Sequence, residues 1–357
     1  MITDLEIQNF KGISSCQLKN VSRVNLLIGK NDSCKSTIME AIYYLFKELQ
    51  FSPQLPEIMS RKFDVSSGGS QLWYKYDTNC QITISVSIFD SFHLEWKVTF
   101  KNEPQLNEQV ISSDMFGGRA RMIPIGAVRY RAQDLAFIGG TVAGRGGPTM
   151  ISNTQEPAIF KDEITQYAAS VSYIDCTLKS RVREIEGILA KFKISPALES
   201  RFGSILADIY EKGKEWEFIP QIENPNEKRL AIREAGQLKY FSGFGDGFRS
   251  CAGIVGTALG SKDTAIFLEE IESHQHAGSL KKLMKYLVEV ARENNLQLFL
   301  STHSKDLWLS LSHGIYLDHP DEEKEEFRAF LIERDSETGK VKAELTDNVQ
   351  KITEALQ

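Results

Sequence analysis

The amino-acid sequence predicts an α/β fold, a mixed sheet with helices on both faces. Apolar, uncharged runs typical of covered strands stand at 24–28, 265–268 and 296–300. Residues at helical spacing follow the first two runs, over 38–49 and 280–292. Alternation of strand and helix favours a parallel sheet.

Composition is that of an ordinary globular chain. Of the 357 residues, 41% are hydrophobic and 25% are charged, and the net charge is -6 at pH 7. These values predict one or two compact units and exclude a disordered, collagen-like or coiled-coil fibrous chain. The net charge does not indicate a nucleic-acid partner, although a local basic groove would still allow one.

The cysteines and the N-terminus predict a cytoplasmic protein. The five cysteines lie far apart without a C-x-x-C pair, so neither a disulfide framework nor a zinc ribbon is indicated. The opening MITDLEIQNF lacks the basic and then apolar order of a signal peptide. No window approaches ~18 uninterrupted apolar residues, so we expect no membrane span.

The N-terminal half combines the first strands with an antiparallel part. Residues 5–10 predict a first strand, and clean alternation over 80–101 with a turn at 90–91 predicts an antiparallel hairpin. The glycine-rich stretch 138–148 has no flanking strand and helix, so we interpret it as a mobile connector rather than a dinucleotide-binding loop. From 163 to 211 the pattern is helical and charged, with breaks at Pro196 and Gly213.

The C-terminal half returns to strands. Strands are expected at 218–222 and 230–233, followed by a helix to about residue 259. Strands at 327–332 and 341–345 and a closing helix end the chain. We therefore divide it into residues 1–150, a helical insert over 151–213, and residues 214–357.

The segment GKNDSCKST lies between a buried strand and an amphipathic helix, where backbone N–H groups converge on an anion. Lys35 is expected to reach the β- and γ-phosphates of a nucleotide, and Ser36 to bind Mg²⁺. Cys34 stands where the pattern GxxxxGK[ST] has glycine, and its side chain either strains the loop, if φ is positive, or is tolerated because it is small. The nucleotide-binding candidates of this loop are Gly29, Lys30, Asn31, Asp32, Ser33, Cys34, Lys35, Ser36 and Thr37.

Two acids follow the strand 265–268. Because ligands bind at the carboxyl ends of parallel strands, Glu269 can hold the Mg²⁺ shell while Glu270 orients an attacking water. A solvated strand end is the alternative, and the phosphate loop makes it the weaker one.

A further strand ends in Ser-Thr-His-Ser, which favours His303 as a γ-phosphate sensor over a structural histidine. Glu272, His274 and His276 could mimic a metal cluster, but loop packing beside the acids is favoured.

In their order, GKNDSCKST, FSGFGDG, FLEEIESHQH and STHS resemble the Walker A, signature, Walker B with D-loop, and switch-histidine motifs of ABC-type ATPases. The likeness is greatest to the OLD (overcoming lysogenization defect) and related AAA-type ATP-binding proteins. The opening LEIQNFKGI resembles the first strand and turn of SMC-like heads. The resemblance implies a P-loop NTPase fold of ABC-ATPase type, with an antiparallel β subdomain and a short helical insert.

The resemblance also implies roles for single residues. Lys11 would approach the nucleotide base, and Lys35, Glu270 and His303 would form the catalytic set. Aspartate is commoner at position 269, and the longer glutamate favours a water-mediated contact with Mg²⁺. The signature loop, which would meet the γ-phosphate held by a second subunit, comprises Ser242, Gly243 and Gly245.

The function that follows is an ATPase using ATP and Mg²⁺, as a homodimer or higher homo-oligomer. Its motion would control an effector protein, such as a nuclease or toxin in DNA maintenance or phage defence, with no membrane partner. Some fifty residues follow STHS, too few for the Toprim nuclease of OLD proteins, and the helical piece is too short for an SMC coiled coil. The alternative is a nucleotide-sensing scaffold that binds ATP and dimerises with little hydrolysis.

Overall fold

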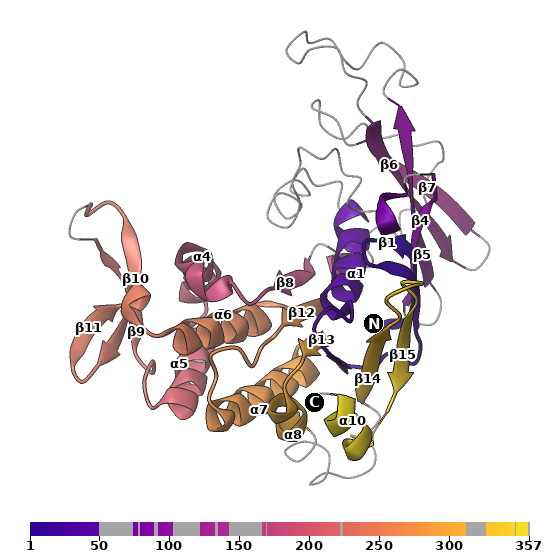
Figure 1. Cartoon of the computed structure of the whole chain (residues 1–357). Coiled ribbons are helices and arrows are strands. Elements are labelled where there is room, and N and C mark those ends of the chain that lie inside the picture. Colours follow the sequence, from indigo (N-terminus) through magenta and orange to yellow (C-terminus); the bar gives the residue numbers. More distant parts are fainter. Residues whose placement is uncertain are drawn as a thin grey trace. The chain divides into compact units, whose positions relative to one another are not determined.

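The structure is a computed structural model of the chain (Figure 1). It describes residues 1–49, 74–77, 79–88, 92–102, 122–132, 135–142, 166–168, 170–221, 224–311, 326–346 and 348–355. Two compact units are present. The first comprises Met1–Ser22, Gly29–Val171 and Phe330–Asp347, and the second Arg23–Ile28, Ser172–Ala329 and Asn348–Gln357. The division at 150 and 213 stays a prediction.

An antiparallel sheet in the order β2-β1-β4-β5-β6-β7 organises the first unit. Its strands are β1 (Ile2–Phe10), β2 (Ile13–Leu18), β4 (Ile82–Ile88), β5 (Phe92–Asn102), β6 (Met122–Ala132) and β7 (Leu135–Val142). Helix α1 (Lys35–Leu49) packs against β1 and β4 with a buried apolar face. The unit also holds the 3-10 helix η3 (Tyr74–Tyr76) and an antiparallel pair formed by the end of β14 (Phe327–Arg334) and β15 (Val341–Leu345).

The predicted hairpin is confirmed, since β4 pairs with β5 from Ile82 opposite Val98 to Ile88 opposite Phe92. Its expected turn at 90–91 lies outside the described residues. The predicted connector at 138–148 is wrong over residues 138–142, which belong to β7 and pair with β6. Glycines weaken a local strand pattern, but here the ladder satisfies their backbone groups. Residues 143–148 lie outside the described part of the chain.

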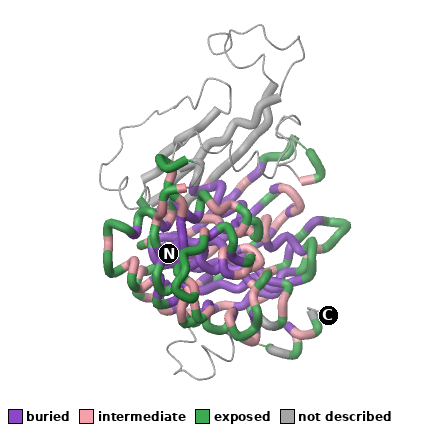
Figure 2. Tube along the Cα trace, turned by 90° about the vertical axis from the view of Figure 1, so that its left-hand side faces the viewer, coloured by how far each residue is buried: buried purple, intermediate pink, exposed green. Residues whose placement is uncertain are grey.

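A parallel ladder in the order β3-β13-β12-β8 forms the centre of the second unit. Its strands are β3 (Val24–Ile28), β13 (Gln297–Thr302), β12 (Ala265–Glu269) and β8 (Ser172–Ile174). Phe267 and Phe299, both fully buried, stack across β12 and β13 at 5.1 Å between ring centroids. Every residue of β3 and β13 is buried, and so are the first four residues of β12. Figure 2 shows the buried residues in purple.

Helices and a small antiparallel sheet complete the second unit. The α-helices are α4 (Val182–Ala190), α5 (Pro196–Tyr210), α6 (Asp246–Gly260), α7 (Ala277–Glu293), α8 (Lys305–Leu311) and α10 (Val349–Ala355). Short 3-10 helices are η5 (Leu178–Ser180), η6 (Lys191–Ile194) and η7 (Phe241–Gly243). The small sheet has the order β11-β10-β9, with β9 (Trp216–Pro220), β10 (Lys228–Glu234) and β11 (Gln237–Tyr240).

The α/β prediction is confirmed, with one correction in the insert. Helices α4 and α5 lie within the region predicted to be helical, and Pro196 begins α5, as its fixed φ favours. Residues Ser172–Ile174 are a strand instead, paired in parallel with β12. Three residues are too few for a strand pattern to emerge from sequence. Within the described residues, no helix is long and apolar enough to cross a membrane.

Candidate functional site

The phosphate loop lies in the first unit and begins at a glycine that the fold requires. A Cβ atom on Gly29 would lie 2.4 Å from the carbonyl oxygen of Ile332 in β14 and 2.8 Å from Ser33 Oγ. No side chain fits at these distances. The loop therefore starts in close contact with the backbone of β14.

The side chain of Lys35 forms hydrogen bonds with residues of the phosphate loop. Its Nζ donates to the carbonyl oxygens of Gly29 and Lys30, both at 2.8 Å, and to Ser33 Oγ at 3.3 Å. The residue is buried, at 7% exposed. Phosphate oxygens would offer this ammonium charged acceptors, which bind more strongly than neutral carbonyls.

Cys34 adopts the strained alternative of the two that the sequence left open. Its φ is 72°, and that of Asp32 is 64°, so two side chains occupy the left-handed region within one loop. Such a conformation costs about 1–2 kcal/mol for a residue with a Cβ. Burial raises the pKa of the Cys34 thiol above its usual 9.0, so the thiol is neutral at neutral pH.

Ser36 and Thr37 stand in the first turn of α1. The N–H of Ile38 donates to the carbonyl of Cys34 at 3.0 Å, which is the first bond of the helix. N–H groups before that point have no carbonyl partner within a helix, and together with the helix dipole they favour an anion. Lys30, Asn31 and Asp32 form the exposed tip of the loop.

Arg334, at the end of β14, is a residue that the sequence analysis missed. Its Nε donates to the carbonyl of Gly12 at 2.9 Å, and its Nη1 lies 3.1 Å from Asp32 Oδ2. The guanidinium thus connects the turn between β1 and β2 to the tip of the phosphate loop. Nothing in the local pattern around position 334 distinguishes it from an ordinary strand-end arginine.

Lys11 occupies the same turn, with a φ of 50°. Its ammonium contacts the carboxylate of Glu40 in α1 and lies 5.5 Å from the ring centroids of Phe10 and Tyr44. Both partners of the ion pair are largely buried. This contact was not anticipated, and the approach of Lys11 to a nucleotide base stays a prediction.

The acid pair and His303 lie in the second unit, where β12 and β13 end. Glu269 lies opposite Ser301 in the parallel ladder. The next residue, Glu270, has a φ of 49° and donates its N–H to the Ser301 carbonyl at 3.1 Å. His303 Nδ1 lies 3.5 Å from Glu270 Oε1. The structure thus brings together two residues that the sequence assigned to one reaction.

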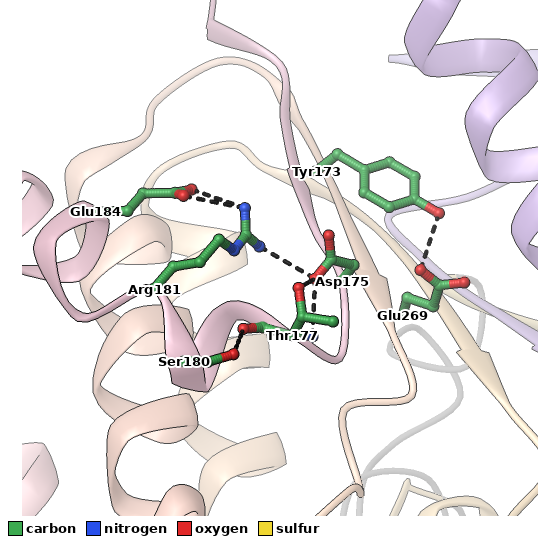
Figure 3. A network of polar contacts seen from close by, with 7 residues as sticks. All are labelled: Tyr173, Asp175, Thr177, Ser180, Arg181, Glu184 and Glu269. Atoms are coloured by element: carbon green, nitrogen blue, oxygen red, sulfur yellow. Dashed lines mark hydrogen bonds and ion pairs between the residues drawn. The ribbon is translucent and has the colours of Figure 1, made fainter. Parts of the chain in front are cut away.

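Glu269 receives a hydrogen bond from β8. The hydroxyl of Tyr173 donates to Glu269 Oε2 at 3.4 Å (Figure 3). Sequence reasoning missed Tyr173 because its strand is only three residues long. Its one available signal was the aromatic and β-branched character of Ser-Tyr-Ile.

Glu272 supports the segment that carries His303. Thr302 Oγ1 donates to Glu272 Oε1 at 2.6 Å, and burial raises the pKa of the Glu272 carboxyl. In the described part of the chain, no group of three or more His, Cys, Asp or Glu residues is placed to hold a metal ion. His274 instead contacts Lys179 through its ring nitrogen Nε2.

The signature segment exposes its polar and small residues. Ser242, Gly243 and Gly245 are exposed, whereas Phe244 and Phe248 are buried and stack at 4.9 Å. Within the described residues, a Cβ atom on Gly243 or Gly245 would meet nothing within 4 Å. The aromatic residues therefore anchor this segment and leave its glycines open.

Gly247 differs from these two glycines. A Cβ atom on it would lie 2.4 Å from the carbonyl oxygen of His274. Gln275 Nε2 also donates to the Gly247 carbonyl at 2.9 Å. The first turn of α6 therefore packs directly on the segment that follows the acid pair.

The predicted metal ligands suit Mg²⁺. The hydroxyl of Ser36 and the carboxylate of Glu269 are hard oxygen donors, each in its own unit. Mg²⁺ is usually bound by one or two protein ligands together with water and substrate phosphates.

Two family models match the chain. One, described as "AAA ATPase domain", matches residues 1–133. The other, described as "AAA domain, putative AbiEii toxin, Type IV TA system", matches residues 152–310. An "ATP/GTP phosphatase" of Helicobacter pylori (strain ATCC 700392 / 26695) is 22% identical over 340 residues, which are 86% of each protein.

Two solved structures share the fold. An SmcHead bound to the C-winged helix domain of ScpA is 15% identical, with 99% of each chain covered and a TM-score of 0.52. An Smc head domain with an extended coiled coil, bound to the C-terminal domain of ScpA derived from Pyrococcus furiosus, is 13% identical, with 99% of this chain and 98% of that one covered and a TM-score of 0.52. The predicted fold class, an α/β fold of the P-loop, ABC-ATPase type, is thereby confirmed for the fold.

Proposed function

We propose that this chain, which has the fold of ABC-type ATPases, binds ATP with Mg²⁺ and hydrolyses it to ADP and phosphate. The register of the parallel ladder carries the proposal. Ile28, which directly precedes the phosphate loop, lies opposite Thr302, and Ser301 lies opposite Glu269. Ligands bind at such carboxyl ends in α/β sheets. The register therefore supports a ligand site at this edge of the ladder in the second unit, where Glu269 and Glu270 lie and where the chain leaves β3 for the phosphate loop.

The residues of each unit have their own task in this proposal. Lys35 and the N–H groups of the loop bind the β- and γ-phosphates, and Ser36 and Glu269 hold Mg²⁺, Glu269 through water. Bound Mg²⁺ supplies charge neutralisation at the phosphate oxygens.

Glu270 takes the proton of the attacking water as the water oxygen bonds to the γ-phosphorus and the bond to ADP breaks. The 3.5 Å contact between His303 and Glu270 supports a histidine that orients this base.

A second copy completes the site. Ser242, Gly243 and Gly245 would meet the γ-phosphate held by the other subunit of a homodimer. Their exposure, beside buried phenylalanines, supports a surface that another molecule meets. A higher homo-oligomer would use the same contact.

The output is control of an effector protein, as in OLD-like systems. The family that matches residues 152–310 is itself described with a putative toxin of a type IV toxin–antitoxin system, which supports a role of this chain in such a system. The similarity to an ATP/GTP phosphatase supports turnover of nucleotide. The strained φ of Cys34 favours the second candidate, a scaffold that binds ATP and dimerises with little hydrolysis.

Two substitutions test the assignment. Lys35→Ala should abolish binding of a fluorescent ATP analogue, because it removes the charge partner of the phosphates. Glu270→Gln should keep binding and stop phosphate release, because the amide keeps the shape and loses the base. Glu289→Gln, on α7, is the matched control and should behave as wild type. Equal rates of ATP hydrolysis by wild type and Glu270→Gln would contradict the assignment of Glu270 as the base.

Light scattering tests the assembly. ATP should increase the mass of the Glu270→Gln chain, because a nucleotide that contacts both copies favours the dimer. Replacing Ser242 with tryptophan should prevent this increase and leave nucleotide binding by the monomer intact. ATP binding and dimerisation without phosphate release, in wild type and in Cys34→Gly, would favour the scaffold.

A further inference from the structure

The hydroxyl of Tyr173 forms a hydrogen bond with the carboxylate of Glu269. Glu269 has one methylene more than the aspartate usual at its position in ABC-type ATPases, so its carboxylate has an additional rotatable bond to fix. The Tyr173 hydroxyl donates to Oε2 of this carboxylate at 3.4 Å (Figure 3). Restricting a flexible side chain before its ligand arrives lowers the entropy lost on binding.

The Tyr173 ring packs against a buried aromatic ring of the neighbouring strand β12. In the parallel ladder Tyr173 lies opposite Phe267, and the two rings stack at 6.1 Å with an interplanar angle of 25°. Phe267 in turn stacks on Phe299 at 5.1 Å. Because both phenylalanines are fully buried, the stack gives the hydroxyl a rigid base.

The end of β8 is held as well. Asp175 accepts hydrogen bonds from the backbone N–H of Thr177 at 2.8 Å and from Arg181 Nη2 at 3.1 Å. Arg181 also contacts Glu184 Oε2 in α4 at 3.0 Å. Figure 3 shows this chain of contacts running from α4 to the strand that carries Tyr173. The chain that directly follows the tyrosine is therefore anchored to α4.

From these contacts we infer that Tyr173 is a positioning residue for the Mg²⁺-binding carboxylate of Glu269. The inference rests on the proposed function. By donating to Oε2, Tyr173 restricts the orientation of the carboxylate that would hold Mg²⁺ through water. In this inference, the hydrogen bond from Tyr173 compensates for the greater flexibility of glutamate compared with aspartate. Partners of this kind orient metal ligands and tune their affinity.

Tyr173→Phe is the test, because it keeps the ring stack and removes only the hydroxyl. A fluorescent ATP analogue is titrated into the full chain, first in EDTA and then in rising Mg²⁺. Affinity in EDTA should equal that of wild type. The Mg²⁺ concentration that gives half of the affinity increase should rise roughly tenfold, the lower end of the range for such partners, because a 3.4 Å bond is long.

Tyr286→Phe is the matched control. Its hydroxyl also interacts with a carboxylate, that of Asp208, but on helices α7 and α5. It should leave the Mg²⁺ titration unchanged. In a Glu269→Gln background, Tyr173→Phe should have no further effect, since the carboxylate that it orients is gone.

The results separate this inference from the proposed function. A Tyr173→Phe titration identical to wild type overturns the inference alone. An equal loss of affinity in EDTA and in Mg²⁺ also overturns it, because that loss indicates a general structural role. A wild-type chain whose ATP affinity does not respond to Mg²⁺ contradicts the proposed function and the inference together.

Discussion

Arg334 should stabilise the phosphate loop mainly through the turn between β1 and β2. Its contact with Asp32 is weak, because the Asp32 side chain is 88% exposed and ion pairs at the surface contribute about 0–1 kcal/mol. The bond from Nε to the Gly12 carbonyl is 2.9 Å long and comes from a side chain that is only 22% exposed. Hydrogen bonds from charged groups contribute about 1.5–3 kcal/mol. Arg334→Ala should therefore lower the free energy of unfolding by about 2 kcal/mol, and Asp32→Asn by less than about 0.5 kcal/mol.

Urea denaturation of the full chain measures both losses. Asparagine is suited to position 32 because it tolerates the positive φ found there. Arg334→Lys keeps the charge but not the planar fork, so it should recover less than half of the loss. An Asp32→Asn chain as unstable as Arg334→Ala would refute the reasoning, since the exposed ion pair would then hold the loop.

Two further predictions concern packing and pH. Gly29→Ala should destabilise the chain by about 1–3 kcal/mol, because its Cβ would overlap the Ile332 carbonyl. Gly187→Ala in α4 should stabilise it by about 0.5–1 kcal/mol, because among the described residues a Cβ atom there meets nothing within 4 Å. Thermal melts distinguish the two signs. Burial raises the pKa of Glu272, so its contribution to stability is complete below the unfolded value of 4.5 and is lost as pH rises through the folded value. Glu272→Gln removes that loss, so the free energy of unfolding of the variant, relative to wild type, should increase as pH rises above 4.5. A difference that stays constant with pH in denaturation experiments would contradict the reasoning.

Elements with a strong local pattern were predictable. Strands β3, β12 and β13 are apolar runs bounded by polar residues, and helix α7 has a clear apolar face. Strand β7 was not predictable, because its glycines say nothing locally about the ladder with β6. Strand β8 depends on pairing with β12, which lies far along the chain. A local sequence pattern carries no information about which distant segment a strand will pair with.

The same distinction separates the site residues that the sequence predicts from those that it does not. The contact between Glu270 and His303 follows from two strand ends, which the sequence marks with polar residues after apolar ones. Arg334 and Tyr173 have no such mark, because their partners are set by the neighbours that each strand finds in the sheet. Lys11 is similar, since its partner Glu40 reads as an ordinary helix acid until the fold buries it.

The segment FSGFGDG contains three glycines, Gly243, Gly245 and Gly247. Saturation mutagenesis at these positions can distinguish a requirement of folding from a requirement of assembly. At Gly247 every side chain collides with the backbone of His274, so selection for a folded chain is enough to retain glycine there. Gly243 and Gly245 meet no such obstacle among the described residues, and neither has a positive φ. If a functional screen nevertheless rejects alanine at 243 or 245 while the variants stay folded, the excluded volume belongs to another molecule, and the pattern of rejected side chains outlines its surface.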